Sequence, residues 1–132
     1  MKTHCLRFHP GQDLKQSLKS FAVQNNLQAA AILTGIGSLN PAALRFAAQP
    51  EATVLTGSFE LISLAGTLSA HGLHLHGAVA DDQGHVYGGH IADGCLVRTT
   101  AEIVLAELSN LCLQRVLDPS TGFLELVVKS SE

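Results

Sequence analysis

The chain has 132 residues, a net charge of −3 and a composition that is 46% hydrophobic but only 14% charged. Its eight Lys and Arg residues form no basic run, which argues against DNA as a direct partner, because nucleic-acid binders gain most of their affinity by neutralising phosphates. No apolar run approaches the ~20 residues that span a bilayer, and residues 1–13 lack the apolar segment of a signal peptide. These features predict a cytoplasmic protein that does not enter the membrane.

The length and the low charge also predict how the chain is organised. A chain of 132 residues has the length of one domain, so we expect a single domain over residues 1–132. Soluble domains average ~25% charged residues, and a domain with 14% has few charged side chains to cover its apolar surface. We therefore expect an oligomer with a buried subunit interface, the alternative being a monomer with a large core.

The N-terminal part predicts one strand followed by one helix. Residues 3–8 alternate between polar and apolar side chains, as in a half-buried strand. Asp13 and Gln16 have the spacing of a capping box, at the start of a helix that should end near residues 25–26. Four side chains should form the apolar stripe of this helix: Leu14, Leu18, Phe21 and Ala22.

The pattern changes to strands from residue 29 onward. Residues 29–38 predict a buried strand that ends in a tight turn at Gly35 and Gly37. The alternative for these glycines is a phosphate-binding loop, but a third glycine and a following helix are missing. Residues 43–47 predict a further short strand.

Residues 53–68 predict β structure with breaks at Gly57 and Gly66. On a strand with strict alternation, Glu60 shares a face with Leu64 in strongly apolar surroundings. This carboxylate should therefore be either paired with an arginine or functional.

The next segment holds most of the histidines and predicts a β-hairpin. Five of the seven histidines lie within residues 71–95. Residues 73–80 and 85–91 predict its two strands, and residues 81–84, Asp-Asp-Gln-Gly, predict the turn between them.

Strand parity selects three of these histidines. His74 and His76 are two residues apart and share a face of the first strand. A tight turn places His90 opposite His76, and directly opposed residues of an antiparallel pair also share a face. His71 and His85 have the wrong parity and fall outside the cluster. The alternative is that the three are merely polar residues on a solvated face.

The same register gives the hairpin a bare back face. Gly77 should lie opposite Gly89, both pointing away from the histidines, so that another backbone could pack closely there. A bulge at Gly88–Gly89 would undo the parity on which this prediction rests.

Three imidazoles on one face are a ligand set for a divalent metal. Imidazole suits zinc, copper, iron or nickel, and three protein ligands with one open position are the pattern of catalytic zinc. We therefore expect a divalent metal, zinc first, on His74, His76 and His90, with no other cofactor-binding residues. The fourth ligand and any catalytic residue are left open by the sequence.

The three cysteines fit a reducing compartment. Cys5, Cys95 and Cys112 are odd in number and form no CxxC pair, which predicts free thiols. Cys95 follows the hairpin closely and is either a metal ligand or, more commonly for a lone thiol, a core residue.

The C-terminal part completes a mostly β pattern. Residues 94–100, 111–118 and 123–129 predict strands, whereas residues 101–108 are ambiguous, because a capping-box spacing favours a helix and the Ile-Val-Leu run favours a strand. The predicted fold class is α/β of the α+β type: one compact domain built on a mostly antiparallel sheet with one or two helices.

Three segments together resemble the plant and prokaryote conserved (PPC) domain. They are GSFELISLAGTL at 57–68, HLHGAVADDQGHVYGGHI at 74–91 and TTAEIVLAEL at 99–108. The resemblance implies a compact domain on an antiparallel sheet, a homotrimer, and a metal site on the residues that match His74, His76 and His90. Stand-alone members are often labelled predicted DNA-binding proteins, but this chain has no AT-hook, and Ser58 stands where plant members typically have arginine.

Three functions remain open at this point. The first is a homotrimeric metal-binding module that holds water or a small ligand. The second is a metal-dependent hydrolase or lyase acting on a small metabolite, and the third is DNA binding or regulation, as the family label implies. For an enzyme, Arg7 or Arg98 could hold an anionic substrate, and the available carboxylates are Glu60, Glu102 and Asp93.

Overall fold

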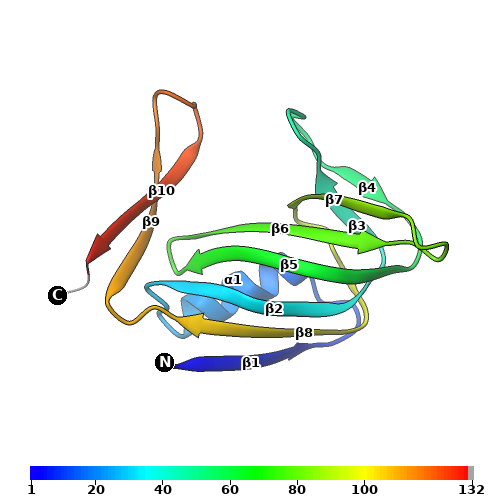
Figure 1. The fold of residues 1–132 in the computed structure, drawn as a ribbon, viewed down its shortest axis with the longest axis horizontal. Helices are drawn as coiled ribbons and strands as arrows, with labels where there is room; N and C mark the ends of the chain where they lie inside the picture. Colours follow the sequence, from blue (N-terminus) through cyan, green and yellow to red (C-terminus); the bar gives the residue numbers. More distant parts are fainter. Residues whose placement is uncertain (131–132) are drawn as a thin grey trace.

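The computed structural model describes residues 1–130 and shows an antiparallel sheet with one helix against one face (Figure 1). Eight strands form the main sheet, in the order β1-β8-β2-β5-β6-β7-β3-β4, and β9 pairs with β10 in a second, two-stranded sheet. The elements are β1 (Thr3–Phe8), α1 (Leu14–Gln24), β2 (Ala30–Leu39), β3 (Ala42–Arg45), β4 (Thr53–Leu55), β5 (Phe59–Ser69), β6 (Gly72–Ala80), β7 (Val86–Ile91), β8 (Val97–Glu107), β9 (Leu111–Leu117) and β10 (Leu124–Ser130). This architecture confirms the predicted α+β class.

Within residues 1–130, none of the helical structure has the length and apolar character needed to cross a membrane.

Helix α1 begins where the sequence predicts, and its cap also ties it to a loop. The Asp13 side chain accepts a hydrogen bond from the Gln16 backbone N–H at 2.9 Å and a second from the Gly94 N–H at 2.7 Å. The reciprocal half of the capping box is not formed, because Gln16 Nε2 donates to Asp93 Oδ1 at 2.7 Å instead. The cap therefore fixes α1 against the loop that follows β7.

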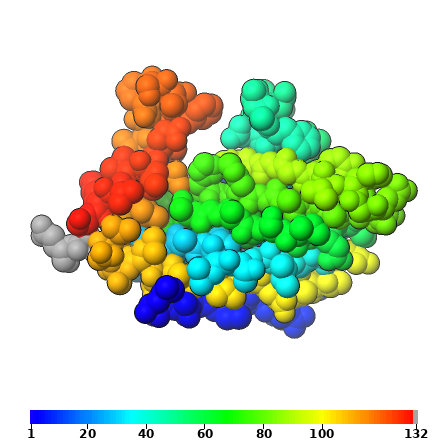
Figure 2. All heavy atoms as spheres, in the orientation of Figure 1, coloured from blue at the N-terminus to red at the C-terminus, as the bar shows by residue number. Residues whose placement is uncertain are grey.

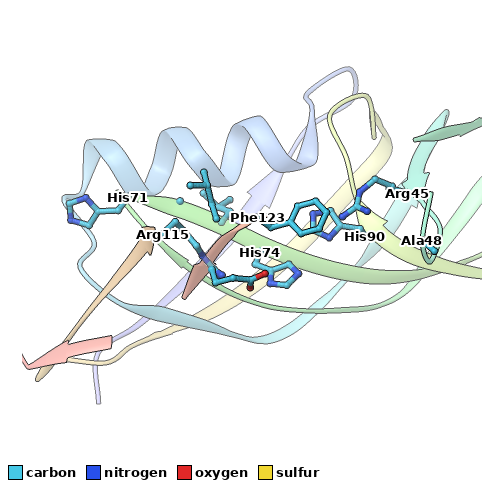
Figure 3. Close-up of a pocket in the computed structure, with 11 residues that line it drawn as sticks. Arg45, Ala48, His71, His74, His90, Arg115 and Phe123 are labelled. Atoms are coloured by element: carbon cyan, nitrogen blue, oxygen red, sulfur yellow. The ribbon is translucent and has the colours of Figure 1, made fainter. Parts of the chain in front are cut away.

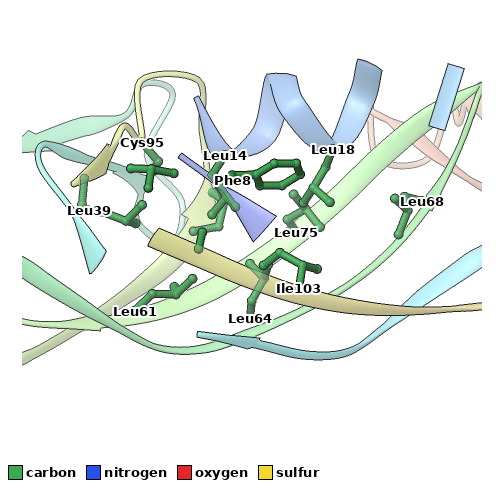
Figure 4. Packing of buried hydrophobic residues seen from close by; sticks show 14 of the residues in the cluster. Phe8, Leu14, Leu18, Leu39, Leu61, Leu64, Leu68, Leu75, Cys95 and Ile103 are labelled. Carbon is green, nitrogen blue, oxygen red and sulfur yellow. The ribbon is translucent and has the colours of Figure 1, made fainter. Parts of the chain in front are cut away.

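The hydrophobic core lies between α1 and the face of the sheet that it covers (Figure 4). Leu14, Leu18 and Ala22 of the helix are fully buried, which confirms the predicted stripe apart from the half-buried Phe21. The sheet contributes large buried side chains from several strands: Leu39, Leu61, Leu64, Leu68, Leu75, Ile91, Ile103 and Leu105.

The predicted glycine turn at residues 35–37 is wrong, because β2 runs through both glycines to Leu39. A Cβ at Gly35 would lie 2.8 Å from the Leu64 Cβ, and one at Gly37 would lie 2.2 Å from the Thr100 carbonyl oxygen. These glycines are needed for close approach of neighbouring strands rather than for a turn. The predicted break at Gly66 is wrong for the same reason, since β5 continues past it, whereas the break at Gly57 is confirmed.

A bulge in β5 overturns the predicted parity around Glu60. The register of β5 against β6 shifts between Leu61 and Ser63. The extra residue brings Leu64 onto the buried face that Leu61 occupies and leaves Ile62 52% exposed. Glu60 is exposed, so it is not the buried carboxylate that strict alternation predicts.

The ambiguous segment at residues 101–108 is a strand. β8 lies between β1 and β2 and pairs with both, so each of its two edges finds a partner. The capping-box alternative does not form: Thr99 lies within β8, where its Oγ1 lies 2.7 Å from Ser38 Oγ. Tertiary pairing thus decides a segment whose local signals conflict.

The β9–β10 hairpin, residues 111–130, forms an arm that stands beside the main sheet, and a hollow separates it from the β3–β4 tip (Figure 2). It is fastened to the sheet by the Leu113 backbone, whose N–H donates to Gln28 O at 2.8 Å and whose carbonyl accepts from Ser69 Oγ at 2.7 Å. The arm carries a group of exposed apolar side chains: Val116, Leu117, Phe123, Leu124, Leu126 and Val128.

Candidate metal centre

The β6–β7 hairpin has the register that the sequence predicts. His76 lies opposite His90 and Gly77 opposite Gly89, and the pairing continues to Ala80 and Val86 with no shift. The hairpin therefore has no bulge at residues 88–89, and the predicted parity of its histidines is confirmed.

His74, His76 and His90, hereafter the histidine triad, converge on one face of the hairpin. Their potential ligand nitrogens all lie within 4.8 Å of one another. His74 Nε2 and His76 Nε2 lie 3.1 Å apart, and the His90 ring centroid lies 4.9 Å from that of His74 and 5.5 Å from that of His76. The structure thus brings together the three residues that strand parity selects.

The surroundings of His74 and His90 favour neutral imidazoles. Burial lowers the pKa of His90 to about 4, and the positive charges of Arg45 and of a protonated His74 act in the same direction. Burial also lowers the pKa of His74 below its usual value, followed by the effects of His76 and Arg115. Since a metal binds the neutral ring, these rings are in the form that a metal requires at neutral pH.

The other candidate ligands lie outside the triad. His85 sits at the hairpin turn, where its Nδ1 is 3.2 Å from Asp81 Oδ2, and His71 lines the outer part of a cleft beside the triad. Cys95 is a core thiol rather than a ligand: it is fully buried, its Sγ contacts both the N–H and the carbonyl of Ala43, and burial raises its pKa to about 11.

Other residues of the chain occupy the space beside the glycines on the back of the hairpin. A Cβ at Gly77 would lie 2.7 Å from Ile91 Cδ1, and one at Gly89 would lie 2.8 Å from the Arg45 carbonyl oxygen. The close packing predicted for this face is confirmed. Strand β3 pairs with β7 beside it, and Arg45 lies opposite His90 in this pairing.

A cleft of about 610 Å³ opens beside the triad, between the arm and the β3–β4 region (Figure 3). His74 and His90 line its floor, Arg45 comes from β3, and Arg115 comes from β9 of the arm. The remaining lining residues are Ala48, His71, Gly72, Leu73, Phe123, Leu124 and Glu125. We call this space the arginine cleft.

Sequence reasoning missed the charged residues of this cleft and proposed others that lie elsewhere. Glu60, Glu102 and Arg98 line a separate hollow formed by β2, β5 and β8. Arg7 Nε donates to Thr100 Oγ1 at 3.1 Å, and Asp93 accepts the hydrogen bond from Gln16 at the helix cap. None of these five charged groups is among the residues that line the arginine cleft.

The fold and the site define a class: an antiparallel α+β domain with three converging imidazoles beside a cationic cleft. The chain belongs to the family described as the Plants and Prokaryotes Conserved (PCC) domain, whose model matches residues 1–109. This confirms the resemblance drawn from the sequence. The matched region includes the whole triad and ends before the arm.

Relatives of known sequence or structure support the same fold. The chain is 49% identical over 129 residues to the "Bifunctional protein GlmU" of Synechococcus sp. (strain JA-3-3Ab), covering 98% of this chain but 21% of that protein, so it spans about a fifth of the curated relative's length. A hypothetical protein from Salmonella enterica has a solved structure with a TM-score of 0.94 and 46% identity, covering 98% of this chain and 94% of that one. A metal-containing protein from Archaeoglobus fulgidus has a TM-score of 0.84 and 27% identity, covering 96% and 94%.

Proposed function

We propose that this chain binds a divalent transition metal, with zinc as the first choice, through His74, His76 and His90. The observation that carries the proposal is the convergence of three imidazole nitrogens within 4.8 Å on one rigid hairpin. Three protein ligands leave one coordination position for water or a small ligand. The proposed role is a metal-binding module that holds such a ligand.

The geometry of the triad fits tetrahedral zinc with small adjustments. Zinc–nitrogen bonds of about 2.0–2.1 Å at tetrahedral angles separate ligand nitrogens by roughly 3.3 Å. His74 and His76 meet this separation already, with their Nε2 atoms 3.1 Å apart. Pairs that lie up to 4.8 Å apart must close by at most about 1.5 Å, which side-chain rotation supplies without moving the strands.

A relative adds independent support. The Archaeoglobus fulgidus protein of the same fold is named as metal-containing, and it is 27% identical to this chain over nearly its whole length. We extend the property to this chain because its hairpin presents a suitable set of ligands.

Elemental analysis of protein purified without an affinity tag tests the proposal. We expect close to one zinc per chain in the parent protein and loss of the metal in His74→Ala and in His90→Ala. His85→Ala, which removes a histidine of the same hairpin outside the triad, is the matched control and should keep the metal. Full retention of metal in both triad variants would contradict the proposal.

We further propose that the protein works as a homotrimer. The arm exposes large apolar side chains outside the arginine cleft, with Val116 49%, Leu117 61% and Val128 54% exposed, and such a patch is costly to leave in water. Light scattering coupled to size-exclusion chromatography should give a mass of about three chains. A monomer at micromolar concentration would contradict this part of the proposal.

A second candidate, a metal-dependent hydrolase or lyase, is favoured by one observation. Glu125 of the arm lines the same cleft as His74 and His90, where it could accept or deliver a proton. A bound divalent metal supplies a Lewis acid that can lower the pKa of coordinated water to about 7. Turnover in a screen of small esters, amides and hydroxy acids, lost in Glu125→Gln with metal retained, would establish this activity, and no turnover would remove it.

We also propose a cytoplasmic location, which the free thiols of Cys5, Cys95 and Cys112 fit. The net charge of −3 argues against DNA as a direct partner, and we propose none.

A further inference from the structure

The arginine cleft holds two guanidinium groups whose charges are not neutralised by a neighbouring carboxylate. The ion pairs found among residues 1–130 join Lys2 or His4 to Glu107 and His85 to Asp81, and they include neither Arg45 nor Arg115. Glu125 shares the cleft but hydrogen-bonds with Thr121 Oγ1 at 3.1 Å. Two positive charges and one negative charge therefore face a common space.

Arg45 lies beside β7, which carries His90, and Arg115 reaches a residue beside β6, which carries His74. Arg45 lies directly opposite His90 in the pairing of β3 with β7. Arg115 reaches from the arm to Thr67, donating from Nη2 to Oγ1 at 2.9 Å, and Thr67 lies opposite His74 in the pairing of β5 with β6. Figure 3 shows the two arginines on either side of His74 and His90.

Local packing holds Arg115 in this place. Gly72 lies beneath its side chain, where an added Cβ would come within 2.9 Å of Arg115 Cγ. On the other side of the cleft, Arg45 Nη1 donates to the Gln49 carbonyl at 3.2 Å. Each guanidinium has five N–H donors, so one such bond apiece leaves most of them for a ligand.

The chemistry of the cleft selects an anion with an apolar part. Guanidinium groups match carboxylate and phosphate oxygens in a two-pronged geometry that a lysine does not provide. Phe123, which is 64% exposed, and Leu73 add apolar wall, and the volume of about 610 Å³ suits a small metabolite. With a divalent metal on the triad, the local charge rises from +1 to +3, as two arginines, one glutamate and the metal contribute +2, −1 and +2.

We propose that the arginine cleft binds a small organic anion, whose carboxylate or phosphate group lies between Arg45 and Arg115 and whose apolar part packs against Phe123. The inference rests on the proposed metal site for the anion's position beside the open coordination position. The arginine pair itself is present without a metal, so anion binding can be measured separately. Arg115 and Phe123 lie beyond residue 109, outside the region that the family model matches.

Calorimetric titration of the full chain, metal-free and zinc-loaded, tests the proposal with three probes: phenyl phosphate, benzoate and inorganic phosphate. We expect phenyl phosphate or benzoate to bind, and the stronger of the two identifies the oxyanion. Inorganic phosphate should bind more weakly than phenyl phosphate, because it leaves Phe123 without a contact. Zinc loading should strengthen binding.

Arginine variants separate recognition from a structural role. Arg45→Gln and Arg115→Gln should each weaken binding by about tenfold or more, the loss of one charged hydrogen bond. Arg98→Gln, in the separate hollow on the main sheet, is the matched control and should bind as the parent does. If Arg115→Gln does not fold, the result for Arg45→Gln tests the proposal. The Arg45 side chain donates its hydrogen bond to Gln49, only four residues away, so its loss should leave the fold intact.

The outcomes for the anion and for the metal are distinguishable. Zinc at one per chain with no anion binding in either metal state overturns this inference alone. Equal affinity in the parent and Arg45→Gln, or an equal loss in Arg98→Gln, also overturns it. Arginine-dependent binding in a protein that takes up no zinc supports the inference and contradicts the metal proposal.

Discussion

Replacing Gly66 by alanine should damage the triad from the neighbouring strand, whereas the same change at Gly77 should not. Gly66 lies opposite Leu75, the residue between His74 and His76. An added Cβ at Gly66 would lie 2.2 Å from the His74 carbonyl oxygen, which is backbone and cannot rotate away. At Gly77 the first contact would be Ile91 Cδ1 at 2.7 Å, the flexible end of a side chain.

The magnitude follows from these contacts. Restoring an ordinary separation of about 3.3 Å at Gly66 requires β5 and β6 to move apart by about 1 Å, and overpacking of this kind costs about 1–3 kcal/mol. For a domain of this size, that corresponds to a fall in melting temperature of roughly 3–12 °C. Gly77→Ala should stay within about 1 kcal/mol of the parent, because Ile91 can change rotamer and alanine fits strand backbone better than glycine.

Thermal unfolding and zinc titration of both variants at equal protein concentration measure the effect. Gly66→Ala should melt lower than Gly77→Ala and should bind zinc more weakly, since the His74 backbone is displaced. Equal melting temperatures and equal zinc affinities for the two variants would refute the reasoning.

Three further predictions address other parts of the molecule. Asp13→Ala should lower the free energy of unfolding by about 1–2 kcal/mol in denaturant titrations, because Asp13 caps α1 and also accepts from the Gly94 N–H; no change would contradict that role. The metal-free protein should lose stability as the pH falls from about 6.5 to about 4, because His90 binds its proton more readily in the unfolded chain, and His90→Asn should flatten this part of the pH profile; an unchanged profile would count against it. In the native protein a thiol reagent at pH 8 should label the exposed Cys5 but not Cys95, as read by peptide mass spectrometry, and fast labelling of Cys95 would contradict its buried, protonated state.

The histidine hairpin could be predicted because its determinants are local. A short turn sets the register of two adjoining strands, and the side-chain period of two then assigns every face. This argument places His74, His76 and His90 on one face, and the pairing of His76 with His90 confirms the register on which it depends.

The sequence predictions are wrong where one inserted residue or a strand distant in the sequence determines the local structure. The bulge in β5 adds one residue between Leu61 and Ser63 without a distinctive composition, so the face of Leu64 could not be read from alternation. The sequence predicts a turn at Gly35 and Gly37, because a glycine needed for close strand approach has the same local signature as a turn glycine.

The charged residues of the cleft could not be predicted for a different reason. Arg45 and Arg115 are 70 residues apart, and they line one cleft because β3 pairs with β7 and the arm returns to β5. Neither residue stands in a motif of its own. Their position depends on tertiary pairing, which single-sequence patterns do not encode.

The central claim is that the three imidazoles hold one metal ion, and anomalous X-ray scattering from crystals grown with zinc tests it most directly. Data collected on both sides of the zinc absorption edge should show one peak per chain, about 2.0–2.1 Å from a ring nitrogen of each of His74, His76 and His90. A fourth feature at bonding distance would mark the ligand position that faces the arginine cleft. Zinc peaks only elsewhere on the protein, with the three rings uncoordinated, would contradict the account.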